Sequence, residues 1–181
     1  VHPCQALADL LTIQEAFGRL KGVRVAYVGD GNNVLHSLLQ GCGMMGVRVM
    51  VATPPAYRPD SAIWREAVRL GKRHGAALQW DADPRRAVRD ADVVYTDVWV
   101  SMGQERQRTQ RVNAFTSYQV NAALLQHAPR GCRIMHCLPA HRGEEITEQV
   151  MESPRSLLFE QAENRLHAQK ALLTFLLKGA Q

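Results

Sequence analysis

Short apolar runs that alternate with segments of helical periodicity constrain this chain more than any other feature. The first run, residues 24–29, ends in Gly29 and leads through polar residues 30–33 into a helix predicted over 34–45. The same pattern predicts further strands at 47–52, 76–80, 92–97, 132–138 and 157–159, and further helices at 3–15, 60–74, 84–89, 117–127, 145–152 and 163–177. This alternation predicts an α/β fold with a doubly wound, mostly parallel sheet flanked by helices.

Size and composition fit one compact domain. The chain has 181 residues, 46% of them hydrophobic, which is enough for a sizeable core. No run of about 18 apolar residues could cross a bilayer, and the first residues do not resemble a secretion signal. The four cysteines, Cys4, Cys42, Cys132 and Cys137, lack the density of a disulfide scaffold. The sequence therefore predicts a cytoplasmic protein with reduced thiols and no membrane partner.

The net charge of +5 raises the question of nucleic-acid binding. The arginines in the middle of the chain are scattered and have no aromatic residues interleaved with them, as Arg65, Arg69, Arg73, Arg85, Arg86 and Arg89 show. A nucleic-acid groove combines clustered positive charge with stacking platforms. The pattern therefore predicts a solvated basic face and no nucleic-acid partner.

In open parallel sheets, ligands bind beyond the carboxyl ends of the strands, where this chain has several polar clusters. The first, Gly29-Asp30-Gly31, resembles the start of a dinucleotide fingerprint, but Val34 occupies the third glycine position. No acidic residue ends the second strand at Ala52, so a nucleotide-cofactor domain is disfavoured and no cofactor is predicted. One of Asn32 and Asn33 suffices to cap the following helix, which leaves the other for a ligand.

Asp97 ends another apolar strand, where its carboxylate could meet a cationic substrate group. Ser101 and Gln104, which follow it, have the spacing of a capping box that opens a polar helix. That structural role does not exclude a role of Ser101 in binding.

Residues 135–145 hold the densest group of reactive side chains. Three hypotheses compete: zinc held by His136, Cys137 and His141, a buried structural cysteine, or a reactive thiol at Cys137. Zinc sites usually have four ligands and a second Cys/His pair is missing, so no metal is predicted. Cys132 lies five residues earlier on the strand, which places the two cysteines on opposite faces.

Residues near both ends of the chain form a weaker set of candidates. His2 and Gln5 are three residues apart at a helix start, so they share a face and could bind one small polar molecule. Arg165 is predicted in the first turn of the last helix, where a positive charge opposes the helix dipole. This placement hints at a ligand, although an ion pair with Glu163 or with another element would also explain it.

Together, these clusters resemble the ornithine carbamoyltransferase family in sequence, order and approximate spacing, over essentially the whole chain. The Ser-Met-Gly and His-Cys-Leu-Pro pieces are specific, because they separate ornithine enzymes from aspartate and putrescine relatives. The matching segments are His2-Pro3-Cys4-Gln5, Asp30-Gly31-Asn32-Asn33, Asp97-Val98-Trp99-Val100-Ser101-Met102-Gly103, His136-Cys137-Leu138-Pro139 and Glu163-Asn164-Arg165.

The resemblance implies a Rossmann-like domain that transfers a carbamoyl group from carbamoyl phosphate to the δ-amine of L-ornithine, giving L-citrulline and phosphate. The implied ornithine-binding residues are Asn33, Asp97, Ser101, Met102, Cys137 and Leu138. The implied carbamoyl-phosphate-binding residues are His2, Gln5, Cys137, Leu138 and Arg165. The candidate catalytic residues are Cys137, Asp97 and Arg165.

These residue types suit the chemistry. An alkyl ammonium has a pKa of about 10.4, so forming the neutral amine near pH 7.4 costs about 4 kcal/mol. An apolar pocket and a proton acceptor lower that cost, and both Cys137 and Asp97 are candidate acceptors. Donors from His2 and Arg165 would stabilise negative charge that develops on the carbamoyl oxygen.

One part of the family pattern is missing. The phosphate-binding motif Ser-Thr-Arg-Thr-Arg lies in an N-terminal domain of the family, and no such string occurs here. Residues 1–16 are therefore expected to form an interdomain helix with the His-Pro-Cys-Gln motif, and 17–162 the ornithine-binding domain. Residues 163–181 are expected to pack back toward the N-terminal carbamoyl-phosphate domain. The resemblance also implies a homotrimer, and we expect the chain alone to lack turnover. The alternative is a non-catalytic amino-acid-binding module.

Overall fold

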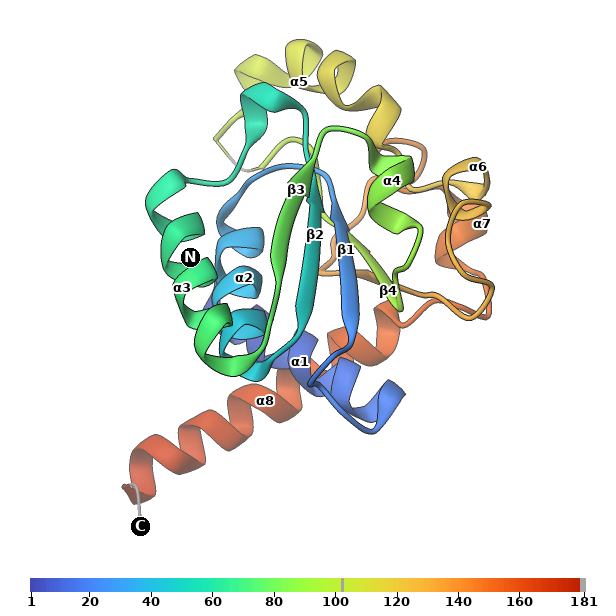
Figure 1. Ribbon diagram of the computed structural model, residues 1–181. Coiled ribbons are helices and arrows are strands. Elements are labelled where there is room, and N and C mark those ends of the chain that lie inside the picture. The colour runs from blue at the N-terminus through green and yellow to red at the C-terminus, as the bar shows by residue number, and fades with distance from the viewer. Residues whose placement is uncertain (102, 180–181) are drawn as a thin grey trace.

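The computed structural model describes residues 1–101 and 103–179. A parallel five-stranded sheet forms its centre, with the strand order β3-β2-β1-β4-β5 (Figure 1). The strands are β1 (Arg24–Val28), β2 (Arg48–Ala52), β3 (Leu78–Asp81), β4 (Val93–Thr96) and β5 (Arg133–His136). The order changes direction at β1 and β4, which places the ends of these strands at the crevice where open sheets bind ligands.

Helices cover both faces of the sheet, as expected of a doubly wound fold. On one side lie α1 (Pro3–Phe17), α2 (Asn33–Met45) and α3 (Ser61–His74), with α8 (Leu158–Lys178) packed on α1. The short helices α4 (Pro84–Val88), α6 (Ala122–Leu125) and α7 (Glu148–Met151) lie on the other side, and α5 (Arg108–Phe115) lies beyond one end of the sheet in Figure 1. The predicted α/β class is confirmed.

Two apolar cores follow from the period of two in the strands, because successive side chains point to opposite faces. Along β1, Val25 and Tyr27 pack under α1, α2 and α3, whereas Ala26 and Val28 pack under the short helices. All four side chains are buried. Strands buried on both faces have continuous apolar runs, and this is the pattern from which they were predicted.

Several predicted elements differ from the structure. The strand predicted at 157–159 is wrong, because α8 already begins at Leu158 and only an isolated bridge joins Ile134 to Ser156. The single helix predicted over 117–127 is also wrong: a 3₁₀ turn (Thr116–Tyr118) and α6 share this segment. The sequence pattern missed α5, whose buried residues are only Arg111 and Phe115. A helix with so little apolar surface leaves almost no periodic signal.

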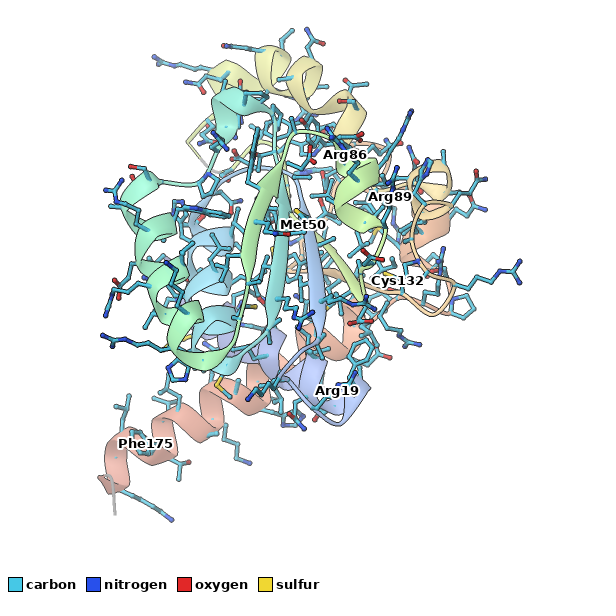
Figure 2. The ribbon with its side chains drawn as sticks, viewed as in Figure 1. Arg19, Met50, Arg86, Arg89, Cys132 and Phe175 are labelled. Atoms are coloured by element: carbon cyan, nitrogen blue, oxygen red, sulfur yellow. The ribbon has the colours of Figure 1, made fainter. Side chains whose placement is uncertain are left out.

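The second half of α8 extends away from the sheet (Figure 1). Figure 2 shows Phe175 on this projecting part. Its large apolar side chains are exposed, namely Leu166, Leu173, Phe175, Leu176 and Leu177. Among the described residues, no helix is both long enough and apolar enough to cross a membrane.

Candidate functional site

A pocket of about 510 Å³ opens at the carboxyl ends of β1, β4 and β5. Most of the side chains that the sequence predicts as ligands line it, although they come from distant parts of the chain. The predicted ornithine-binding residues on its wall are Asn33, Asp97, Ser101, Cys137 and Leu138. His2 and Gln5 from the start of α1 complete the wall. Met102, also predicted to bind ornithine, lies outside the described residues.

The two asparagines after β1 divide their roles as the sequence suggested. Asn32 caps α2, with Oδ1 accepting hydrogen bonds from the amides of Val34 (3.0 Å) and Leu35 (3.1 Å). Its Nδ2 donates to Asp97 Oδ2 over 2.6 Å. Asn33 is exposed and lines the pocket, so its carboxamide is available to a ligand.

Asp97 is the centre of the hydrogen bonds on this wall. Its Oδ1 accepts from the Val98 amide and from the Cys137 thiol, both at 2.8 Å, and Oδ2 accepts from Asn32. The residue is only 4% exposed. A carboxylate held by several donors in a buried place is preorganised to receive a cation.

The pKa values of Cys132 and Cys137 are both raised, which does not fit a reactive thiolate. Burial and the neighbouring Asp97 carboxylate raise the pKa of Cys137 far above its usual range, so its sulfur carries the proton that it donates to Asp97. Burial raises the pKa of Cys132 to about 12. Cys132 belongs to one apolar core and Cys137 packs against the other, as the predicted opposite faces require.

His136 has a structural role that the sequence did not reveal. Its Nδ1 accepts a hydrogen bond from the Leu138 amide (2.8 Å), so Nε2 carries the proton and faces Glu145 Oε1 at 3.2 Å. Both ring nitrogens are thus engaged within the described chain, which disfavours His136 as the zinc ligand considered above. Leu138 has a φ of 52°, a strained value that the His136 contact helps to hold.

One of the two hydrogen bonds of the predicted capping box forms in the segment after Asp97. The Ser101 amide donates to Gln104 Oε1 (3.2 Å), but a 3₁₀ turn at Glu105–Gln107 follows before α5 begins. Ser101 lines the pocket, so its structural and binding roles are compatible.

A buried ion pair that the sequence did not predict joins two of the pocket's loops. Arg111 on α5 pairs with Asp30, and its Nε donates to the Trp99 carbonyl over 2.6 Å. The guanidinium also lies over Tyr57, 4.8 Å from the ring centroid. Burial raises the pKa of Asp30 to about 6, although Arg111 opposes that rise. Because Asp30 precedes the asparagines and Trp99 lies between Asp97 and Ser101, Arg111 fixes the two loops relative to each other.

Gly31 lets the loop after β1 pack closely against residues 57–59. Its amide donates to the Tyr57 carbonyl over 3.0 Å. A Cβ atom at this position would lie 2.5 Å from backbone atoms of Tyr57, Arg58 and Pro59, so the two backbones can approach only because residue 31 is glycine.

Contacts between α1 and α8 bring the last predicted residues together, although Arg165 itself is not among the residues that line the pocket. Arg165 Nη1 donates to Gln5 Oε1 over 2.6 Å. Burial and the nearby Arg165 lower the pKa of His2, so its ring is neutral at pH 7. The prediction that Arg165 lies in a first helical turn is wrong, because α8 begins at Leu158. The proposed ion pair with Glu163 is not formed, since Glu163 faces His167 at 3.5 Å.

Named proteins are similar to this chain over almost its whole length. A bacterial protein from Gloeobacter violaceus named ornithine carbamoyltransferase is 56% identical over 98% of this chain. An ornithine carbamoyltransferase from Pyrococcus horikoshii is 52% identical over 99% of it. The chain spans 57% of the length of each of these relatives.

Solved structures show the same fold. The ornithine carbamoyltransferase from Pyrococcus furiosus superposes with a TM-score of 0.95 at 51% identity, covering 100% of this chain and 58% of that one. The Gloeobacter violaceus enzyme gives 0.87 at 55% identity over 95% of this chain and 57% of that one. The family profile described as "Aspartate/ornithine carbamoyltransferase, Asp/Orn binding domain" matches residues 21–176. The chain therefore belongs to the aspartate/ornithine carbamoyltransferase family and contains its Asp/Orn binding domain.

Proposed function

We propose that this chain supplies the acceptor site for carbamoyl transfer from carbamoyl phosphate to the δ-amine of L-ornithine. The observation that carries the proposal is the buried Asp97 carboxylate, which is held by Asn32 and Cys137 and lines one pocket with Asn33 and Ser101. Asp97 suits the α-ammonium of an amino acid, and the amide and hydroxyl of Asn33 and Ser101 suit its carboxylate. All sequenced relatives reported above carry the ornithine carbamoyltransferase name.

In the proposed reaction, the amine nitrogen forms a bond to the carbamoyl carbon, and the bond from that carbon to the phosphate oxygen breaks. Phosphate leaves with the electron pair. The amine must lose a proton, and the geometry favours Asp97 over Cys137 as its final acceptor, because the Cys137 thiol already points its own proton at Asp97. Cys137 can relay a proton by accepting one from the amine while giving its own to Asp97.

The carbamoyl group is proposed to lie near the His2, Gln5 and Arg165 side of the pocket. Gln5 offers an amide donor and acceptor to the carbamoyl amide, and Arg165 reinforces it with positive charge. Donors that face a developing oxyanion stabilise the transition state more than the ground state. Leu138 and Cys137 line the same pocket, and the Cys137 thiol contacts Asp97, which suits a position next to the reacting δ-amine.

We further propose that turnover requires an N-terminal carbamoyl-phosphate domain and assembly into a homotrimer. The resemblance to the family supports this division: residues 1–16 link the domains, 17–162 hold ornithine, and 163–181 pack toward the N-terminal domain. The projecting part of α8 supports it as well, because its exposed leucines and Phe175 form an apolar surface that a second domain would bury.

The first experiment compares citrulline formation by this chain alone and by this chain combined with the N-terminal domain of the Gloeobacter violaceus relative, which we call the combined protein. We expect turnover only from the combined protein. Full activity of the chain alone would contradict the division of the site. Ornithine binding that is independent of carbamoyl phosphate, with no citrulline from either protein, would instead support an amino-acid-binding module.

The two cysteines that flank β5, Cys132 and Cys137, provide a second prediction. Replacing Cys137 by Ala in the combined protein should lower kcat for citrulline formation by at least about tenfold, because a thiol that relays a proton is lost. Cys132→Ala removes a thiol that is more deeply buried, from the opposite face of the sheet, and is the control. Equal effects of the two substitutions on kcat would contradict a role of Cys137 in the reaction.

A further inference from the structure

A buried carboxyl group lies directly behind the donor side of the pocket and plays no part in the proposed reaction. Asp9, on α1, has 0% of its surface exposed. Its Oδ1 accepts hydrogen bonds from Gln5 Nε2 (2.8 Å) and Gln161 Nε2 (2.7 Å), and Oδ2 accepts one from the Tyr95 hydroxyl (3.2 Å). The four residues come from α1, β4 and α8, and the side chains of Gln5, Tyr95 and Gln161 are also buried.

This arrangement fixes the orientation of the Gln5 amide. Arg165 donates to Gln5 Oε1, and Asp9 accepts from Gln5 Nε2. After a flip of the amide, Nε2 would face the Arg165 donor and Oε1 would face the Asp9 carboxylate, and neither pair could form a hydrogen bond. Gln5 Nε2 has a second hydrogen and Oε1 a second lone pair, and both remain for a molecule in the pocket that Gln5 lines. An amide held in this way recognises a group with the complementary donor and acceptor.

The same network reaches the far side of the pocket. Gln161 Oε1 accepts from the His136 amide over 2.9 Å, directly before Cys137 in the chain. Gln161 Nε2 also donates to Tyr95, whose hydroxyl is 3.1 Å away. Gln161 therefore ties the end of β5 to the carboxylate that orients Gln5.

Keeping a carboxylate in this place costs stability. Burial raises the pKa of Asp9 to about 7, against the opposing effect of its three hydrogen bonds. The pKa of Asp9 in the folded chain exceeds its value in the unfolded chain, so the free energy of unfolding falls as the pH rises and Asp9 becomes charged. A neutral amide of the same shape would avoid that cost, which argues that the carboxylate has a role other than stabilising the fold.

We propose that Asp9 is a positioning residue for the carbamoyl donor. It orients Gln5, and Gln5 in turn holds Arg165. Gln5 and Gln161 both donate to Oδ1 of Asp9, so removing this acceptor leaves the Gln5 amide without the partner that fixes its orientation. The inference rests on the proposed function, since it assigns the carbamoyl group to the Gln5 side.

The test is calorimetry with carbamoyl phosphate and no ornithine, on the combined protein. Asp9→Leu keeps the approximate size of the side chain but removes both acceptor oxygens, and we expect it to weaken carbamoyl-phosphate binding about tenfold. Thr12→Val is the matched control. It removes another buried hydrogen bond between α1 and α8, from Asn164 Nδ2 to Thr12 Oγ1, and should leave the Kd within about twofold of wild type.

A double-mutant cycle with Gln5→Ala separates positioning from general damage. If Asp9 acts through Gln5, Asp9→Leu should weaken binding no further once Gln5 is absent. A Kd of Asp9→Leu within twofold of wild type, or additive effects in the cycle, would overturn the proposal. If Asp9→Leu does not fold, Asp9→Ser carries the same expectations. Failure of the wild-type combined protein to bind carbamoyl phosphate would instead refute the proposed function.

Discussion

Replacing Asp97 by Asn in the combined protein should raise the KM for ornithine by about 30-fold or more. The substitution leaves the shape of the wall but removes the charge that we propose pairs with the ornithine ammonium. Losing one partner of a buried, hydrogen-bonded charge pair costs about 2–5 kcal/mol, and each 1.4 kcal/mol is about tenfold in affinity. The measurement is the steady-state rate of citrulline formation over a range of ornithine concentrations. Loss of the proton acceptor should lower kcat as well.

The matched control lies just before the same strand. Asp92→Asn also removes a carboxylate next to β4, but Asp92 pairs with the half-exposed Arg24, whose Nη2 lies 3.0 Å from Asp92 Oδ1, outside the pocket. Exposed ion pairs contribute about 0–1 kcal/mol, so the KM for ornithine should stay within about twofold of wild type. If Asp97→Asn changed that KM by less than about threefold, Asp97 could not be the ammonium partner.

Replacing Arg111 by Met should destabilise the fold by about 3–5 kcal/mol, because it leaves Asp30 buried without its cation. The free energy of unfolding can be measured by urea denaturation of the chain itself. Arg108→Met is the control on the same helix: Arg108 pairs with Glu144, but its side chain is 51% exposed, so about 0–1 kcal/mol is expected.

The effect of Arg111→Met should also depend on pH in a defined direction. The pKa of Asp30 is about 6 in the folded chain even with Arg111 present, and it must rise further without the guanidinium. At pH 5 Asp30 is mostly protonated with or without Arg111, so little is lost. At pH 8 it is charged in the unsubstituted chain, and without Arg111 it must either stay buried as an unpaired charge or take up a proton at a cost that grows with pH. The loss of stability should therefore be larger at pH 8. A second substitution, Asp30→Asn, should restore part of it, and no recovery would show that the ion pair is not the cause.

The fold could be predicted in detail from the sequence wherever strands are buried on both faces. The runs around Val25–Val28 and Val49–Ala52 are continuous and apolar, and their positions were correct to within two residues. Prediction failed for α5 and for the start of α8, since α5 buries only two side chains and the first turn of α8 had been taken for a strand. Short helices with few buried residues carry too little periodic signal to compete with turn signals.

The candidate site could be predicted to a similar degree. Asn33, Asp97, Ser101 and Cys137 follow strands or begin helices, and the known geometry of parallel sheets places such positions at one edge. The residues that support them could not be predicted, because their partners are distant in sequence: Arg111 and Asp30 are 81 residues apart, and Asp9 and Gln161 are 152 residues apart. Long-range side-chain pairs leave no local pattern, so the sequence offered no signal for this supporting layer.

The tight contact at Gly31 limits how this pocket could change during evolution. Every side chain, whatever its chemistry, would collide with the backbone of residues 57–59, so the loop that carries Asn33 is a fixed wall. Gly103, in the loop that carries Ser101, has open space around it but a φ of 87°, so a side chain there would strain the backbone without colliding. A new acceptor preference would therefore have to arise at side chains such as Asn33 and Ser101, because neither glycine can be replaced without disturbing the backbone.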